Sequence, residues 1–358
     1  MKKIGIMTFH RALNFGAKLQ AFALMETLNK NNFDASILDY RCNEIENFYY
    51  GKKGLKGFVK KIIFPRFCHA LNIRKKNFSN FDKLYKTTKV YTAKNIQNSN
   101  EELDAFVVGS DQVWNPIITG NDYNYFLPFA DKSKSISYAA SFGKAKISDW
   151  DEAKLHSLFD NFDGLLTREE SAANMINAFD NKFNASAVLD PVFLLDKNDW
   201  VTKLNLKVNP PKQKYIFVYI VAQQTNLLER AKKIATEKNL KVIFVDSGRK
   251  ADRFFTKENT LGPIEFLNLL LNAELVITTS FHALAFSLIF NVPFQYELSK
   301  EKVNANSRLS DIAKNLDIEQ FELLDVDSQI LQNYNWAAIN NKIGNLKEES
   351  IKKLINLI

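Results

Sequence analysis

The feature that most constrains the fold is the alternation of short, unbroken apolar segments with longer amphipathic ones. The short segments have the composition of strands that are buried on both faces of a parallel sheet. Alternation of such strands with helices predicts right-handed βαβ units and a doubly wound α/β fold. The segments predicted as strands are residues 3–8, 35–39, 105–108, 135–139, 164–167, 187–190, 215–221, 241–246 and 274–278.

Two domains are indicated by the length of the chain and by one polar stretch. The 358 residues exceed what one ordinary core accommodates. Residues 197–214 are polar and contain Pro210-Pro211, which is typical of a crossing between domains. We therefore predict an N-terminal domain over residues 1–196 and a C-terminal domain over residues 212–330. The final segment, residues 331–358, is amphipathic and is predicted to form a helix that packs back on the first domain.

The composition is that of a cytoplasmic enzyme. Hydrophobic residues make up 46% of the chain and charged residues 25%, as in ordinary globular proteins. No apolar run reaches the length of a membrane span, and the N-terminus enters an apolar strand without a signal-peptide pattern. The two cysteines, Cys42 and Cys68, lack the spacing of a metal or redox site. No metal site is therefore predicted.

Positive charge is concentrated in one segment. The chain has 48 basic and 40 acidic residues, and its net charge is +8. Between Glu46 and Asp82 there are nine basic residues and no acidic one, so subtracting nine from +8 leaves −1 for the rest of the chain. The nine are Lys52, Lys53, Lys56, Lys60, Lys61, Arg66, Arg74, Lys75 and Lys76.

This basic segment has two interpretations. Apolar residues recur at helical spacing between Leu55 and Ile63, so one interpretation is a helix that packs its apolar face inward and exposes its lysines. The other is that residues 52–76 contact an anionic membrane surface, on the inner face of the membrane, or an anionic lipid-linked acceptor. Nucleic acid is not predicted as a partner, because neither aromatic stacking positions nor a known motif accompany the charge.

Candidate functional residues are sought where strands end, because ligands of open α/β sheets bind beyond the carboxyl ends of the strands. After the first predicted strand, His10, Arg11 and Asn14 precede a helix whose amino terminus favours anions. The loop lacks a Gly-x-Gly-x-x-Gly pattern, so no dinucleotide cofactor is predicted. Asn14 is equally suited to cap the helix, and both roles stay open.

The densest polar loop follows the apolar strand Ala-Phe-Val-Val. It contains Ser110, Asp111, Gln112, Trp114 and Asn115, and burying so many polar groups in a core would be costly. Asp and Asn also bend and cap chains, which accounts for Asp111 and Asn115 without any ligand. The five residues together exceed what a turn requires, so the loop is predicted to bind substrate.

Two arginines and a histidine follow other strands. Arg168 stands at a strand end, where it either forms an ion pair with Glu169 or Asp190 or offers a planar fork to a carboxylate or phosphate. His282 opens a helix directly after small hydroxyl residues. A lone histidine is more often structural than catalytic, but this position is one where anions bind. Arg308 begins a further helix and offers a second anion fork.

At these residues the sequence resembles the polysaccharide pyruvyl transferase family. The resemblance covers nearly the whole chain. It implies two Rossmann-like domains facing across a cleft, a glycosyltransferase-B-like arrangement, in which Asp111 and His282 meet only across the cleft. The matching motifs are residues 14–24, 108–116, 137–143, 168–171, 189–191, 262–263, 278–282, 291–294 and 306–308.

The resemblance also implies a reaction. The donor is phosphoenolpyruvate, and the acceptor is a pair of hydroxyls on a sugar of a capsule or exopolysaccharide, or of its lipid-linked oligosaccharide precursor. The product is a pyruvyl ketal, and neither a cofactor nor a metal is required. In this chemistry Arg168, with Arg308 as a second candidate, binds the anionic groups of the donor.

The remaining roles follow the same scheme. His282 binds the phosphate or acts as general acid, and Asp111 deprotonates or positions the sugar hydroxyl. Trp114 stacks on a sugar face. The residues predicted to contact donor or acceptor are Asn14, His10, Ser110, Gln112, Asn115 and Ser280.

Two positions beside the histidine differ from the family pattern. Family members commonly have arginine before it and glycine after it, whereas this chain has Phe281 and Ala283. Phe281 removes one anion fork, and the methyl group of Ala283 narrows the approach to the helix start. Two other functions stay open: a nucleotide-sugar-dependent glycosyltransferase of similar architecture, and a non-catalytic glycan-binding or glycan-assembly protein.

Overall fold

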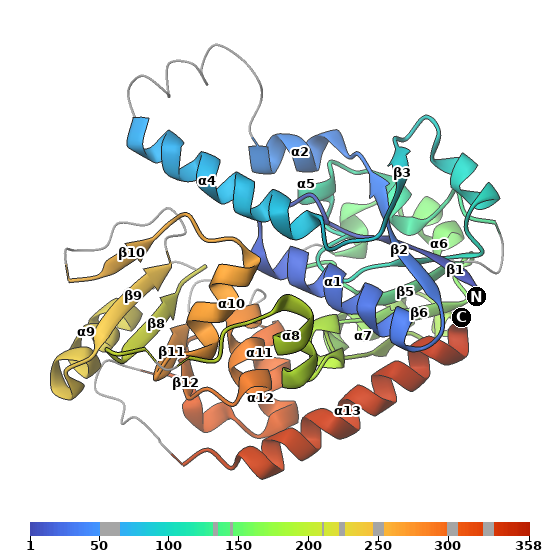
Figure 1. Ribbon diagram of the computed structural model, residues 1–358. Helices are drawn as coiled ribbons and strands as arrows, with labels where there is room; N and C mark the ends of the chain where they lie inside the picture. The colour runs from blue at the N-terminus through green and yellow to red at the C-terminus, as the bar shows by residue number, and fades with distance from the viewer. Residues whose placement is uncertain are drawn as a thin grey trace. The chain divides into compact units, whose positions relative to one another are not determined.

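The chain forms two compact units, each built on a parallel β-sheet (Figure 1). Unit 1 comprises residues 1–59, 80–194 and 345–358, and unit 2 comprises residues 60–79 and 195–344. The predicted helix around residues 55–63 lies outside the described residues. The computed structural model describes residues 1–50, 65–131, 135–143, 146–209, 211–221, 226–245, 254–298, 307–324 and 333–358.

The sheet of unit 1 has seven parallel strands in the order β3-β2-β1-β4-β5-β6-β7. In its centre, Ile6 of β1 is paired with Ile37 of β2 on one side and with Val107 of β4 on the other. The strand order reverses between β1 and β4, so the carboxyl ends of these two strands flank a topological switch point. The strands are β1 (Lys3–Met7), β2 (Asp34–Tyr40), β3 (Thr87–Tyr91), β4 (Ala105–Val108), β5 (Ser135–Ala140), β6 (Gly164–Thr167) and β7 (Ser186–Ala187).

The sheet of unit 2 has five parallel strands in the order β10-β9-β8-β11-β12. Val218 of β8 pairs with Phe244 of β9 and with Ile277 of β11. The order reverses between β8 and β11, which gives this unit its own switch point. The strands are β8 (Tyr215–Tyr219), β9 (Lys241–Val245), β10 (Thr256–Glu258), β11 (Leu275–Thr278) and β12 (Phe294–Tyr296).

Helices connect and cover the strands (Figure 1). Two of them, α4 and α13, contribute residues to both units. None of the helices in the described ranges is long and apolar enough to span a bilayer. The α-helices are α1 (Phe15–Lys30), α2 (Asn43–Tyr50), α4 (Pro65–Asp82), α5 (Pro116–Thr119), α6 (Glu152–Phe159), α7 (Glu170–Phe179), α8 (Lys197–Leu204), α9 (Asn226–Lys238), α10 (Pro263–Leu271), α11 (Phe281–Phe290), α12 (Ser307–Leu316) and α13 (Trp336–Leu357).

The two helices that follow the central strands begin at side-chain caps. Asn14 Oδ1 accepts a hydrogen bond from the Ala17 amide at 3.1 Å, which fixes the start of α1. Ser280 caps α11 in the same way, and all ten residues of α11 are buried. This helix stops at Asn291, which adopts the left-handed conformation that ends many helices. The cap interpretation of Asn14 is therefore confirmed.

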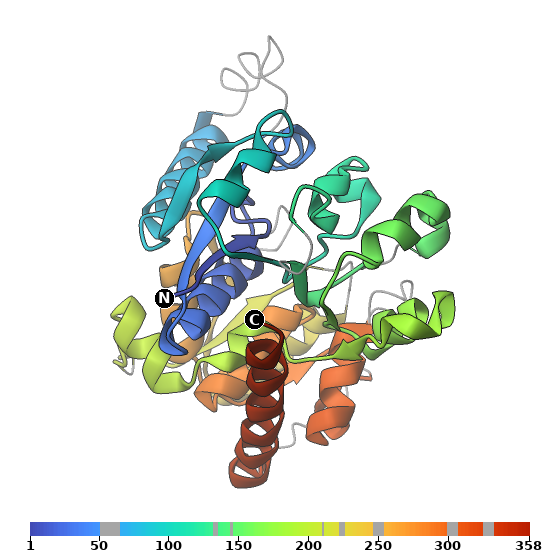
Figure 2. The ribbon, with the colours of Figure 1, turned by 90° about the vertical axis from the view of Figure 1, so that its right-hand side faces the viewer.

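The end of α13 packs on unit 1. Leu354 is fully buried, the Leu189 amide donates to Ser350 Oγ at 3.0 Å, and Lys2 Nζ donates to the Ile358 carbonyl. These contacts place the two ends of the chain close together, as Figures 1 and 2 show. The structure assigns residues 345–358 to unit 1 and the earlier part of α13 to unit 2.

The predicted two-domain, parallel α/β fold is confirmed, with differences at the edges. The strands β3, β10 and β12 were not predicted, because they are short edge strands without an unbroken apolar run. The stretch predicted as a domain crossing contains the helix α8, which carries the fully buried Trp200. The larger segment of unit 2 begins at Leu195, whereas the predicted C-terminal domain begins at residue 212, and residues 60–79 also belong to unit 2.

Candidate functional site

The backbone of unit 1 is strained where β4 and β5 end. Asp111 has a φ of 78° and Ala139 a φ of 48°, which non-glycine residues rarely adopt. The pairing of β5 with β6 shifts register between Ser137 and Ala140. At Gly109, with φ 119°, a Cβ atom would lie 2.1 Å from the Tyr138 carbonyl oxygen, so only glycine fits. Clustered strain and a bulge beside a switch point are typical of functional sites.

Arg168 occupies the middle of a carboxylate cluster next to this loop. Its Nε lies 3.0 Å from Glu169 Oε1, and its Nη1 lies 3.2 Å from Asp190 Oδ2 and 3.7 Å from Asp111 Oδ1. Burial alone would lower the pKa of Arg168, but the charges of Glu169, Asp190 and Asp111 outweigh burial and raise that pKa. The guanidinium of Arg168 faces protein carboxylates, and its role as donor anchor stays a prediction. The ion-pair interpretation is confirmed.

The side chains of Ser110 and Trp114 lie in the core of unit 1. Ser110 is fully buried: its amide donates to Gln20 Oε1 at 3.0 Å and its Oγ to Asp190 Oδ2 at 3.3 Å. Trp114 is 0% exposed, stacks on Phe126 and donates its Nε1 proton to the Tyr125 carbonyl. Neither side chain has a solvent-facing surface in this structure, so their contact with a sugar stays a prediction that the observed contacts do not support.

Gln112 and Asn115 brace the same loop. Asn115 Oδ1 accepts from the Ile117 amide and thereby caps α5, while its Nδ2 donates to Gln112 Oε1 at 3.1 Å. The turn-and-cap interpretation of Asn115 is thus confirmed. Asp111 accepts from the Gln112 amide at 2.9 Å, yet its side chain remains 14% exposed. Asp111 is therefore the carboxylate of the Arg168 cluster that is most accessible to a ligand, since those of Glu169 and Asp190 are nearly covered.

Sequence reasoning named Glu169 only as an ion-pair partner of Arg168 and gave Ser141 no role. Ser141 Oγ donates to Glu169 Oε1 at 3.0 Å and accepts from the Gly143 amide at 2.9 Å. Ser141 lies after the end of β5 and Glu169 after the end of β6. They belong to the sequence motifs 137–143 and 168–171. The signal was present, but a small hydroxyl and a glutamate beside an arginine are too common to be singled out without the fold.

A second polar group surrounds the loop after β1. The His10 ring is nearly buried, with Nδ1 3.2 Å from the Thr8 carbonyl oxygen and Nε2 3.1 Å from Asp39 Oδ1. Thr8 Oγ1 donates to the Ser110 carbonyl at 3.0 Å, which ties this loop to the loop after β4. The ends of β1 and β4, at the switch point, thus carry His10 and Asp111 on connected loops.

Lys18 fixes the loop after β1 through a hydrogen bond to its backbone. It is fully buried, and its Nζ donates to the His10 carbonyl and to the Asp82 carboxylate. Burial lowers the pKa of Lys18, while the ion pair with Asp82 opposes that shift. A buried ammonium persists only with such partners, so the placement of His10 depends on Lys18.

Asp39 is expected to make stability depend on pH in the acid range. Burial opposes its ionisation, but hydrogen bonds from His10 and Arg41 outweigh burial and lower its pKa from 3.8 to about 2. When a carboxyl group has a lower pKa in the folded protein than in the unfolded chain, its ionisation stabilises the folded protein at any pH above the unfolded pKa. This stabilisation is lost as the pH falls through the folded pKa. We expect Asp39→Asn to cost about 2 kcal/mol at neutral pH, with the difference vanishing near pH 2. Urea unfolding of wild type and variant between pH 2 and neutral pH measures the difference in unfolding free energy. A difference that does not change with pH would contradict the prediction.

The candidate residues of unit 2 lie at its own switch point. The β11 end is fixed by Thr278 Oγ1, which donates to the Tyr219 carbonyl, and by Thr279 Oγ1, which accepts from the Val221 amide at 2.9 Å. Ser280 then caps α11, and His282 lies in its first turn rather than before it. The Phe281 and His282 rings meet edge to face at 5.2 Å. An imidazole at the positive end of a ten-residue helix suits an anionic group.

Arg308 lies on α12, also in unit 2, as the second residue of that helix. Its side chain is half-buried. Of the predicted site residues, Ser280, His282 and Arg308 thus belong to unit 2, whereas Asn14, His10, Asp111 and Gln112 belong to unit 1. The fold divides the predicted residues into a carboxylate-rich group and a cationic or hydroxyl-bearing group.

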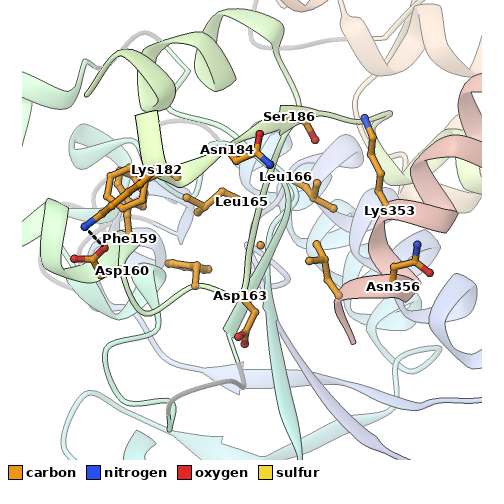
Figure 3. A pocket seen from close by; sticks show the side chains of 14 residues that line it. Phe159, Asp160, Asp163, Leu165, Leu166, Lys182, Asn184, Ser186, Lys353 and Asn356 are labelled. Atoms are coloured by element: carbon orange, nitrogen blue, oxygen red, sulfur yellow. Dashed lines mark ion pairs between the residues drawn. The ribbon is translucent and has the colours of Figure 1, made fainter. Parts of the chain in front are cut away.

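A cavity of about 610 Å³ lies elsewhere in unit 1 (Figure 3). It is lined by the amino end of β6 at Gly164, by Asn184 and Ser186, and by Lys353 and Asn356 of α13. The strands are parallel, so this cavity lies at the end of the sheet opposite to Asp111. Its lining includes none of the predicted site residues, and it is not the candidate site.

Comparison with known proteins agrees with the fold and identifies the family. No curated protein is similar enough in sequence to be matched. The UDP-GlcNAc 2-epimerase of Neisseria meningitidis bound to UDP-GlcNAc aligns over 99% of this chain and 100% of its own, with 10% identity and a TM-score of 0.53. A putative UDP-N-acetylglucosamine 2-epimerase of Listeria monocytogenes aligns over 99% and 90%, with 12% identity and a TM-score of 0.50.

At these identities the likeness to solved structures shows the fold alone, and it supports the predicted glycosyltransferase-B-like class. The family assignment comes from the sequence. The model of the family described as polysaccharide pyruvyl transferase matches residues 14–294, which include the loops that carry Asp111, Arg168 and His282. This span is most of the chain, and the protein therefore belongs to the polysaccharide pyruvyl transferase family.

Proposed function

We propose that the protein transfers pyruvate from phosphoenolpyruvate to two hydroxyls of one sugar in a cell-surface glycan or its lipid-linked precursor. The observation that carries the proposal is the family match, which spans both strand-end groups described above. The transferase class follows from the family, whereas the donor, the acceptor and the residue roles are our proposal.

The charge of the Arg168 cluster favours a neutral acceptor on unit 1. Three carboxylates, those of Asp111, Glu169 and Asp190, surround the single guanidinium of Arg168. An excess of negative charge repels the carboxylate and phosphate of phosphoenolpyruvate. The same carboxylates are good acceptors for sugar hydroxyls. We therefore assign the acceptor to unit 1, with Asp111 as the base, Gln112 as a further contact, and His10 and Asn14 on the neighbouring loop.

The residues of unit 2 favour the donor. His282 and Ser280 lie at the amino end of α11, where the helix dipole attracts anions. Arg308 is a planar cation suited to a carboxylate or phosphate. Because the guanidinium of Arg168 is paired with protein carboxylates, Arg308 is our principal candidate for holding an anionic group of phosphoenolpyruvate, and Arg168 is the second. Phe281, which stands where the family commonly has arginine, makes this role of Arg308 more important.

The proposed reaction balances without a redox partner. A proton adds to the methylene carbon of phosphoenolpyruvate, and the adjacent carbon becomes an oxocarbenium-like centre. One sugar hydroxyl attacks this centre as Asp111 accepts its proton. The second hydroxyl then attacks the same carbon, the bond to phosphate breaks, and the phosphate leaves with the second proton. His282 either donates the first proton or binds the departing phosphate.

The direct test is to combine the purified protein with phosphoenolpyruvate and candidate glycans. Release of phosphate together with a gain of one pyruvyl group in the mass of the glycan supports the proposal. Binding of a nucleotide sugar without binding of phosphoenolpyruvate favours a glycosyltransferase. Binding of phosphoenolpyruvate without turnover on any acceptor favours a non-catalytic glycan-assembly role. The latter two outcomes would each replace the proposed reaction.

We expect His282→Gln to weaken phosphoenolpyruvate binding about 10- to 100-fold, because a hydrogen bond to a charged ligand contributes about 1.5–3 kcal/mol. Isothermal titration calorimetry measures this without an acceptor. The matched control is His156→Gln, which changes a histidine of unit 1 that is paired with Asp180 at 2.8 Å. Equal affinities of wild type and the His282 variant would remove His282 from the donor site.

A further inference from the structure

We propose that the cavity between β6 and the end of α13, here called the β6–α13 cavity, binds a neutral sugar residue of a glycan. Its volume of about 610 Å³ lies within the range of about 300–1,000 Å³ that is typical of small-ligand sites. All of its lining residues belong to unit 1, so the cavity is complete within one unit. It lies at the end of the sheet opposite to Asp111 and is therefore separate from the site of the proposed reaction.

Part of the wall of this cavity is apolar. Leu165 and Leu166 of β6 line it, and Phe183 and Leu357 add further carbon surface. Phe183 and Leu357 are only partly buried, so their surface is open to a ligand. Figure 3 shows the two leucines with polar and charged side chains around them. Carbon surface within a polar border suits a ligand that has an apolar face and a polar circumference.

The charged side chains of the lining do not favour a charged ligand. Lys182 Nζ lies 2.7 Å from Asp160 Oδ1, the pair marked by a dashed line in Figure 3, and Lys353 Nζ lies 2.8 Å from Glu349 Oε1. The fourth charged lining residue is Asp163, and Figure 3 shows its carboxylate pointing away from Lys182 and Lys353. Two lysines and two aspartates balance in charge, so the cavity offers no excess of either sign to an anion or a cation.

Three neutral polar side chains provide hydrogen-bonding groups for a ligand. They are Asn184, Ser186 and Asn356, and within the described ranges none of the three side chains has a hydrogen-bond partner in the protein. Two carboxamides and one hydroxyl together supply both donors and acceptors. Asn184 and Ser186 come from the chain at β7, whereas Asn356 comes from α13. The three groups therefore approach the cavity from two elements.

This combination fits a sugar better than other small ligands. A pyranose ring has an apolar C–H surface and carries several hydroxyls that both donate and accept hydrogen bonds. An alkyl chain would leave the three polar side chains without partners, and an ionic ligand would find the lysines already paired. The family of this protein acts on polysaccharides, so a glycan is the natural source of such a sugar. Holding a long glycan at a second point raises its effective concentration at the enzyme.

The test uses the full-length protein without donor and follows titrations with neutral disaccharides by ligand-observed NMR. The probes are maltose, lactose and N,N′-diacetylchitobiose. We expect at least one of them to bind. Joint substitution Asn184→Gly and Asn356→Ala should weaken that binding by about tenfold or more, because two carboxamides that bond to the sugar are lost. Glycine suits position 184, where φ is 46°.

The matched control is Asn32→Gly with Asn161→Ala. It also removes two exposed carboxamides of unit 1, one of them at a φ of 64°, but neither lines the cavity. This control should bind the disaccharide like wild type. All four substituted side chains are exposed, so circular dichroism should show an unchanged fold in both variants.

Each outcome decides the proposal. Failure of all three disaccharides to bind overturns it. Binding that Asn184→Gly with Asn356→Ala retains also overturns it, because the sugar then occupies another place, such as the surroundings of Asp111. Inorganic phosphate and phenylethylamine are the charged probes, and binding of either one in place of the disaccharides, lost in the same variant, would show a site for ions. Disaccharide binding without any pyruvyl transfer would reject the proposed function and leave this inference standing.

Discussion

Asp111→Asn is expected to lower turnover with phosphoenolpyruvate and glycan by about 10²- to 10⁴-fold, the usual contribution of a general base. Asparagine keeps the size and the loop hydrogen bonds of the side chain but cannot accept the proton of a sugar hydroxyl. Asp111 is the exposed member of the Arg168 cluster, and its strained φ of 78° indicates a position held for function. Phosphate release under saturating donor measures the effect.

The control for this experiment is a carboxylate of the same unit at the opposite end of the sheet. Asp163 lines the cavity of Figure 3, and Asp163→Asn should leave turnover unchanged. Binding of phosphoenolpyruvate should be unaffected by Asp111→Asn, because the donor is assigned to unit 2. Full turnover by the Asp111 variant would exclude the proposed base.

Arg168→Met is expected to lower the free energy of unfolding by about 3–5 kcal/mol, the cost of leaving buried charges without their partner. The side chain of Arg168 is 2% exposed and faces Asp111, Glu169 and Asp190. Removing its charge leaves three carboxylates to repel one another. Urea unfolding measures the difference at neutral pH, where all three carboxylates are ionised in the unfolded chain.

The matched control is Lys182→Met, which removes an exposed cation paired with Asp160 at 2.7 Å. Exposed ion pairs contribute little to stability because water and salt screen them, so this variant should unfold nearly as wild type does. Unchanged stability of Arg168→Met would contradict the expected structural cost. Loss of phosphoenolpyruvate binding in an Arg168→Met variant that remains folded would support the predicted role of Arg168 as donor anchor.

The central part of the fold was predictable because buried parallel strands have a recognisable sequence pattern. β4, β8 and β11 are covered on both faces and read as unbroken apolar runs. Edge strands such as β3 and β10 are largely exposed, so their composition does not distinguish them from loops. The helix α8 was missed because it is short and largely polar, and only Trp200 and Leu204 of its residues are buried.

The site was predictable in position but not in detail. Strand-end loops located Asp111 and His282 correctly at two switch points. The sequence did not indicate that Trp114 points into the core. It offered Glu169 and Asp190 as ion-pair partners of Arg168 but did not decide between this pairing and an anion site. Both orientations depend on the conformation of the loop after β4. The positive φ angles of Gly109 and Asp111 and contacts with residues distant in sequence, such as Asp190, determine that conformation.

The assignment of residues 345–358 to unit 1 has a consequence for biosynthesis. The first unit to emerge from the ribosome contains β1 to β7, but it also needs the end of α13, where Leu354 is fully buried and Leu357 packs against Gly164. Unit 1 therefore cannot complete its packing until unit 2 has been translated. During that interval the nascent chain exposes the apolar surface beside β6 that the end of α13 covers in the folded protein, and transiently exposed apolar surface favours aggregation.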